Sequence, residues 1–319
     1  MHGPVQLHRG DLVTSRRTGD ALVNAAPFDT FLSVGGLTLR VVSDDRRLAA
    51  PASGSLAPFF ADHGRADVEI QAGWMDAPTA CDGRLLFDSG GAWQLLESDG
   101  AFLFTFRSSI GGPLPYKVAR FNQPFSEGDV RLSRPHFEQH PAAAIDPLQY
   151  PLDELVMIHL LSQGKGVEIH ACGLLDRSGR AYLFVGQSGA GKSTIARLWA
   201  ATAGVTMLSD ERVVLRTDRT PIVVYGTPWQ GDAHLASPAS GPLAAVFFLN
   251  RGAAPRIAPV RGSQAAARLF SCAFLPFHDA GAVGRTMTAV EQVIGGTPCY
   301  DLWFAPDRSV VDVVARHMG

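Results

Sequence analysis

Nine residues constrain the fold of this chain more than any other segment, because residues 186–194 read Gly-Gln-Ser-Gly-Ala-Gly-Lys-Ser-Thr. They fit the phosphate-binding P-loop pattern G-x-x-x-x-G-K-[ST] without a gap. The apolar run at 182–185 before them is typical of a buried strand. After them, Ile195, Leu198 and Trp199 recur at helical spacing. We therefore predict a strand, a glycine-rich turn and a helix, which is the context that the motif requires.

This segment has the chemistry of a nucleotide site. Glycines at 186, 189 and 191 let the backbone turn tightly and direct its N–H groups inward, next to the positive end of the following helix. Lys192 is expected to reach the terminal phosphates, and Ser193 to offer its hydroxyl to Mg²⁺. An ordinary glycine turn is the alternative interpretation. The predicted nucleotide-binding residues are Gly186, Gln187, Ser188, Gly189, Ala190, Gly191, Lys192, Ser193 and Thr194.

A pair of carboxylates follows at short range. Residues 207–211 read Met-Leu-Ser-Asp-Glu, so a short apolar strand ends in Asp210 and Glu211. A right-handed crossover through one helix is expected to place this strand beside the P-loop strand, with its acids near the phosphates. Transporter and motor ATPases usually carry this acidic strand much farther along the chain, and no Leu-Ser-Gly-Gly signature occurs here. A solvated turn with two acids is the alternative.

Composition excludes several classes of function. The formal net charge is −2, so no basic field points to nucleic acid. No apolar stretch reaches the length that spans a bilayer, and no signal-peptide core is seen at the N-terminus. The four cysteines form no C-x-x-C pair, which argues against a zinc site. We therefore predict a cytoplasmic protein that binds neither nucleic acid nor a membrane.

The 319 residues allow two domains. In the front half, a hairpin is expected from 31–34 and 37–42, followed by strands at 68–70, 84–87, 93–96, 102–106 and 117–121. Short turn signals between these strands indicate an antiparallel meander. Four prolines at 135–151 mark a boundary between a β-rich domain, 1–150, which could hold the substrate, and a P-loop catalytic domain, 151–319. The second domain is expected to begin with an amphipathic helix from residue 152 to near 164, with a strand at 167–171 after it.

His170, the P-loop and the run Leu-Ser-Asp-Glu-Arg-Val at 208–213 resemble, in order and spacing, the HPr kinase/phosphorylase family of bacterial serine kinases. The resemblance covers roughly 150–260. The layout resembles still more the HPr-kinase-related proteins encoded beside peptide-modification genes, including kinases of lasso-peptide precursors. Two segments carry that likeness: Pro-Leu-Asp-Glu-Leu at 151–155 and Gly-Thr-Pro-Trp-Gln-Gly at 226–231. It implies an α/β P-loop kinase core of the HPr kinase/phosphoenolpyruvate carboxykinase type, preceded by a β-rich N-terminal domain.

The resemblance and the chemistry of the residues together suggest roles. The predicted catalytic residues are Asp210, Glu211, His170 and Lys192, and the predicted Mg²⁺ ligands are Ser193, Asp210 and Glu211. One acid holds the metal and the other accepts the proton of the attacking hydroxyl; we favour Asp210 as the base, but the two could exchange roles. His170 either tunes that carboxylate or contacts a phosphate. Trp229 either stacks on a ligand or covers the core, and Arg251 is either an anion clamp or a surface residue.

The predicted function is that of an ATP-dependent phosphotransferase. It uses ATP and Mg²⁺ to phosphorylate a serine hydroxyl of a peptide or small protein, a ribosomal peptide precursor among the candidates. Two alternatives remain open: a kinase of a small-molecule hydroxyl, and a nucleotide-gated peptide-binding protein without turnover. HPr kinases assemble as hexamers, so the resemblance leaves a homo-oligomer open.

Overall fold

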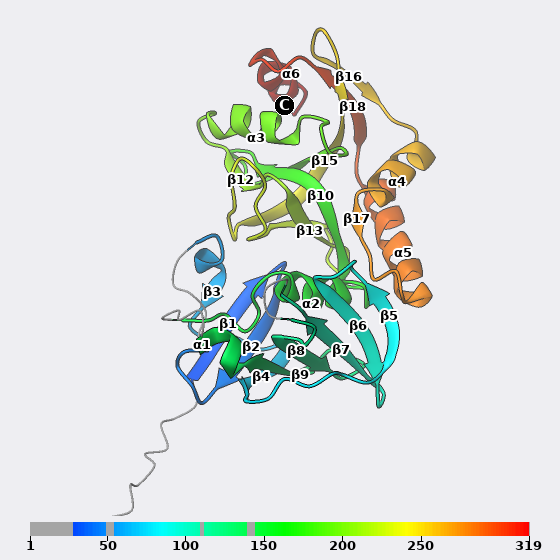
Figure 1. Cartoon of the computed structure of the whole chain (residues 1–319). Helices are drawn as coiled ribbons and strands as arrows, with labels where there is room; N and C mark the ends of the chain where they lie inside the picture. Colours follow the sequence, from blue (N-terminus) through cyan, green and yellow to red (C-terminus); the bar gives the residue numbers. More distant parts are fainter. Residues whose placement is uncertain (1–27, 49–53, 109–111, 139–143, 319) are drawn as a thin grey trace, which may run out of the picture.

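The computed structural model describes residues 28–48, 54–108, 112–138 and 144–318, and it is built mainly from strands (Figure 1). Strands hold 38% of these residues and helices 23%. The strands of the described residues form two sheets of nine strands each. Figure 1 shows the first sheet at the bottom and the second above it, with helix α2 between them.

The first sheet has the order β3-β1-β2-β4-β9-β8-β7-β6-β5. Its strands are β1 Phe28–Val34, β2 Leu37–Ser43, β3 Phe60–Ala61, β4 Val68–Met75, β5 Arg84–Asp88, β6 Trp93–Ser98, β7 Ala101–Phe106, β8 Lys117–Phe121 and β9 Glu127–Ser133. The predicted hairpin and the five predicted strands after it are confirmed. β5 to β9 form an antiparallel meander, as expected, but β4 pairs in parallel with both β2 and β9, so the sheet is mixed.

The second sheet closes on itself. Its strands are β10 Gly166–Leu175, β11 Ala181–Val185, β12 Thr206–Ser209, β13 Arg212–Arg216, β14 Val223–Gly226, β15 Ser240–Arg251, β16 Arg256–Pro259, β17 Ala273–Phe274 and β18 Cys299–Phe304. β11, β10, β13, β14 and β15 pair in that order, and β15 pairs back to β11, which makes a five-stranded barrel. β18 and β16 extend the sheet from β15.

This architecture overturns the predicted fold class. An α/β P-loop kinase core was expected in the C-terminal half, but the structure is mostly β, with an open sheet and a barrel. The strand–loop–helix unit of the P-loop is present, yet β12 does not lie beside β11. It pairs antiparallel with β10 instead. The reason is that the P-loop strand is one arm of the antiparallel β10–β11 hairpin, so β10 already occupies the edge where a crossover strand was expected.

The helices are α1 Arg134–Glu138, α2 Leu152–Leu161, α3 Lys192–Ala200, α4 Gly262–Phe270, α5 Ala280–Gly296 and α6 Ser309–Met318, with a 3₁₀ turn η1 at Ala57–Phe59. β11 divides its side chains between two cores. Leu183 and Val185 pack in the core that includes α4 and α5, whereas Tyr182 and Phe184 pack in the core with α3 and α6. The alternation of a strand thus fixes the P-loop between two helical layers.

Helix α2 departs from the expected amphipathic pattern, because all ten of its residues are buried, including Asp153, Glu154 and His159. Its apolar side chains belong to the core of the first sheet, together with Val214 and Trp229 from the second half of the chain. The domain boundary predicted at residue 150 stays a prediction, but this core continues through Leu161.

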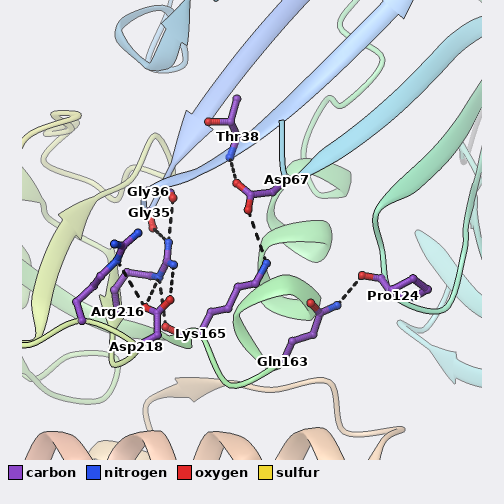
Figure 2. Close-up of polar contacts among 10 residues, drawn as sticks. Gly35, Gly36, Thr38, Asp67, Pro124, Gln163, Lys165, Arg216 and Asp218 are labelled. Atoms are coloured by element: carbon purple, nitrogen blue, oxygen red, sulfur yellow. Dashed lines mark hydrogen bonds and ion pairs between the residues drawn. The ribbon is translucent and has the colours of Figure 1, made fainter. Parts of the chain in front are cut away.

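Polar contacts also join the two sheets (Figure 2). Arg216 of β13 is 4% exposed and donates from Nη1 to the carbonyl oxygens of Gly35 and Gly36, at 2.9 Å each. Those two carbonyls belong to the β1–β2 turn. Nearby, Gln163 Nε2 donates to the Pro124 carbonyl at 2.8 Å. The two Arg216 bonds are charge-assisted, and such bonds are stronger than neutral ones, so the turn of the first sheet is held against the barrel.

Candidate active site

The P-loop begins where β11 ends at Val185, and helix α3 begins at Lys192. Gly189 and Gly191 have φ values of +78° and +103°, a region that side chains with a Cβ rarely adopt. A Cβ on Gly191 would also lie 2.7 Å from the Phe304 ring. The loop conformation therefore favours glycine at these two positions, of which Gly191 is the second glycine of the motif and Gly189 is a position that the motif leaves open.

Lys192 lies across the loop that precedes it. Its Nζ donates to the Gly186 carbonyl at 2.8 Å and to the Gln187 carbonyl at 3.4 Å. Burial lowers the pKa of Lys192, and the negative charge of Glu211 acts in the opposite direction. The ammonium group is thus held at the phosphate-binding loop, close enough to Glu211 for the two charges to interact.

His170 and Glu211 form a pair in front of the loop. His170 Nε2 lies 2.9 Å from Glu211 Oε1. Burial, and next the charge of Lys192, lower the pKa of His170, while Glu211 raises it. A neutral imidazole donates one N–H, so we assign the Nε2 proton to this contact. His170 therefore orients the Glu211 carboxylate, whereas its expected roles, tuning the catalytic base or contacting a phosphate, stay predictions.

A cavity of about 670 Å³ brings these groups together. It is lined by His170, Ser188, Gly189, Gly191, Lys192, Ser193, Thr194, Glu211, Arg212, Gln230, Gly231, Asp232 and His234. We call it the active-site cavity. The P-loop, His170 of β10 and a loop at 230–234 therefore line the same cavity. No site residue was predicted in that loop, and its only sequence signal was the family-like segment Gly-Thr-Pro-Trp-Gln-Gly at 226–231, which overlaps its start.

Asp210 is not on the wall of the active-site cavity. Its side chain is fully buried. Its carboxylate accepts backbone N–H groups from Gly231 at 3.0 Å, Ala233 at 2.7 Å and Leu235 at 3.3 Å. A carboxylate bound in this way shapes the 231–235 loop. The two acids that the sequence presents as a pair therefore have different surroundings: Asp210 faces the loop backbone and Glu211 faces the cavity.

The wall of the active-site cavity carries oxygen groups of the kind that bind Mg²⁺. Ser193, Glu211 and Asp232 all line the active-site cavity. Within the described part of the chain, no three His, Cys, Asp or Glu side chains converge as a ready-made metal site. Mg²⁺ is usually held by one or two carboxylates with waters and substrate phosphates completing its shell, so a few oxygen ligands beside the P-loop agree with its needs.

A smaller cavity of about 360 Å³ lies against the same loop. It is lined by residues 185–190 together with Phe248, Leu249, Arg268, Ser271 and Cys272. Ser188 and Gly189 line both cavities. Arg251 is exposed and donates from Nη2 to the Gly189 carbonyl at 3.2 Å, so it lies beside the loop, where an anion clamp was one of its two expected roles.

Two segments noted in the sequence contact each other behind the site. Trp229 is 6% exposed, and its Nε1 donates to Asp153 Oδ2 at 2.8 Å. Of the two roles expected for Trp229, the structure therefore shows the one in the core. Glu154, which follows Asp153 in α2, pairs with Arg212. Helix α2, which packs on the first sheet, therefore contacts Arg212, a residue that lines the active-site cavity.

The buried carboxyl of Asp153 predicts a pH effect on stability. Burial raises its pKa from 3.8 to about 7, although the bond from Trp229 lowers it. The folded state then binds this proton more tightly than the unfolded state, so its contribution to stability falls as pH rises from about 4 to about 7. We expect Asp153→Asn to become more stable relative to the natural chain over that range, by on the order of 4 kcal/mol.

Urea unfolding of both proteins at a series of pH values checks this expectation. The quantity to compare is the difference in unfolding free energy between the two proteins. Buried His159, whose pKa is lowered to about 4 by burial, makes stability rise with pH between about 4 and 6.5 in both proteins, so its effect cancels in that difference. A difference in unfolding free energy that does not change with pH would contradict the buried, proton-binding state of Asp153.

Comparisons with known proteins add no identity. Among the described residues, no helix is both long enough and apolar enough to cross a membrane. The likeness to HPr-kinase-related proteins stays a prediction. No protein-family model and no curated protein sequence matches this chain.

Proposed function

We propose that this protein is an ATP- and Mg²⁺-dependent kinase that phosphorylates a serine hydroxyl of a peptide or small protein in the cytoplasm. One observation supports the proposal most: Lys192 and Ser193 of the P-loop share a cavity with the Glu211–His170 pair. A P-loop alone suits a nucleotide binder. A carboxylate facing the P-loop lysine adds the base that transfer to a hydroxyl requires.

The residues suggest how the reaction proceeds. The serine oxygen attacks the γ-phosphorus, an O–P bond forms, and the P–O bond to the leaving ADP breaks. The hydroxyl proton passes to the carboxylate of Glu211, which His170 holds by its Nε2–H bond. Lys192 leaves the Gly186 carbonyl for the transferred phosphoryl oxygens, whose charge it stabilises.

Glu211 is the base in this proposal, rather than Asp210, which was favoured on sequence. Asp210 already accepts three backbone N–H groups and lies outside the active-site cavity. Mg²⁺, when bound, neutralises charge on the phosphoryl oxygens. Ser193 and Asp232 are the residues on the wall that would hold it, since Glu211 is occupied as the base.

Intact-mass analysis of peptides tests the proposal. Serine-containing peptides, HPr and any precursor peptide encoded nearby are incubated with the protein, ATP and Mg²⁺. We expect one phosphate to be added by the natural chain and none by Lys192→Ala. Phosphorylation of free sugars or serine, but of no peptide, would favour the small-molecule alternative. Tight nucleotide binding with no phosphorylated product from any acceptor would favour the nucleotide-gated binding protein.

A further inference from the structure

A mostly apolar cavity of about 450 Å³ borders the active-site cavity, and Arg212 lines both. It lies where the first sheet, α2 and the segment around β17 meet, which are close together in Figure 1. We call it the aromatic groove and define it by Phe87, Trp93, Tyr150, His159, Phe274 and Phe277.

The mouth of the aromatic groove exposes apolar surface. The side chain of Phe277 is 70% exposed and that of Tyr150 is 54% exposed. Deeper in the groove, the rings of Phe87 and Trp93 stack with centroids 5.0 Å apart. Large aromatic side chains held open to water beside a polar site are typical of a surface that binds a partner.

Arg212 forms a fixed wall between the aromatic groove and the active-site cavity. It pairs with Glu154, and its guanidinium lies 4.9 Å from the centre of the Phe274 ring and 5.7 Å from that of Tyr150. These contacts keep the side chain in place. A ligand that fills both cavities therefore passes over one arginine.

The groove is also lined by two histidines whose Nε2 atoms are buried and unpaired in the described structure. His159 Nδ1 contacts the Leu155 carbonyl at 2.7 Å, so Nδ1 carries the proton and Nε2 is the acceptor. Neither His159 Nε2 nor His278 Nε2, from the two histidines that line the groove, has a hydrogen-bond partner in the described structure. Both nitrogens are shielded from solvent, so only a ligand group that inserts between the side chains of the groove reaches them. An indole N–H or a phenol O–H inserted there can donate to His159 Nε2, whereas a phenyl ring cannot.

We propose that the aromatic groove binds a tryptophan or tyrosine side chain of the substrate peptide, a few residues from the serine that is phosphorylated. This inference rests on the proposed kinase function. An extended peptide advances roughly 3.3 Å per residue, so a chain that crosses the single shared wall at Arg212 places its anchor close in sequence to the serine. The continuity of the two cavities favours one ligand that spans both.

Matched peptides test the groove. Each short synthetic peptide carries one serine and, at a set distance on either side, Trp, Tyr, Phe or Ala; kcat/KM is measured for the natural chain, Phe277→Ala, Tyr150→Ala and Met287→Ala. Met287 is a matched control, being 47% exposed on α5 and outside the groove. We expect the Trp and Tyr peptides to be preferred at one distance. That preference should fall about tenfold in the two groove variants and stay unchanged in Met287→Ala.

Direct binding separates the groove from the kinase. The same peptides are titrated into the protein with Mg²⁺ and a non-hydrolysable ATP analogue, and affinity is measured by fluorescence anisotropy. Peptides phosphorylated with no aromatic preference, or with one that the groove variants leave intact, would refute the groove and spare the kinase. No phosphorylation, but aromatic binding that Phe277→Ala weakens, would refute the kinase and support the groove. If no peptide is phosphorylated and no binding depends on the groove, both the kinase and the groove proposals are refuted.

Discussion

Glu211→Gln is expected to lower kcat for phosphoryl transfer by roughly 10²–10⁴-fold, the range that a general base contributes. Glutamine keeps the size of the side chain and can still pair with His170 Nε2, but its amide cannot take the hydroxyl proton. Nucleotide affinity should be kept, because the P-loop backbone and Lys192 are unchanged. Single-turnover kinetics with a peptide that the natural chain phosphorylates give the rate of phosphoryl transfer. Nucleotide affinity is measured separately.

Glu291→Gln is the matched control for this expectation. Glu291 is exposed on α5 and does not line the active-site cavity. Its substitution removes one negative charge, as Glu211→Gln does, and should leave kcat unchanged. The assignment of Glu211 is lost if Glu211→Gln keeps its activity while Asp210→Asn, correctly folded, loses it. That pattern would restore Asp210 as the base.

Asp210→Ala is expected to lower the free energy of unfolding by about 3 kcal/mol or more. The change removes the acceptor of three backbone N–H groups in a fully buried place. Each buried donor left without a partner costs about 1–3 kcal/mol. Urea unfolding followed by circular dichroism measures the change, with Asp210→Asn as an intermediate case that keeps one acceptor oxygen.

Asp232→Ala gives the contrast in the same loop. Asp232 is exposed, and its backbone carbonyl, rather than its side chain, accepts a hydrogen bond from Arg197 Nη2 at 3.4 Å. Its replacement should change stability by no more than about 0.5 kcal/mol. Equal stability losses in Asp210→Ala and Asp232→Ala would show that Asp210 does not organise the loop.

Local structure was readable from the residues. The P-loop was predicted because its glycines, lysine and hydroxyls act within a few residues of one another, and the structure has positive φ at Gly191, the second glycine of the motif. Strand positions in the front half were predicted from alternation and turn residues, which are also short-range signals. Whether the loop binds ATP stays a prediction.

The partners of the strands were decided only by tertiary structure. The pattern of β12 is that of any short buried strand, and nothing in it states whether β11 or β10 lies beside it. The expected parallel crossover failed because β10 fills that edge, and the barrel closes through the distant β11–β15 pair. Strand pairing depends on contacts far apart in sequence, so a local pattern predicts a strand but not the fold class.

The same limit applies to the site. The sequence by itself determined the chemical groups: a P-loop lysine, two adjacent acids and an upstream histidine. Only the tertiary structure decided that Asp210 turns to the backbone of a loop more than twenty residues later, while Glu211 meets His170 in the cavity. Adjacent residues at a strand end point different ways, and the segments that pack around them select which one stays buried. For the same reason Trp229 lies against Asp153 in the core.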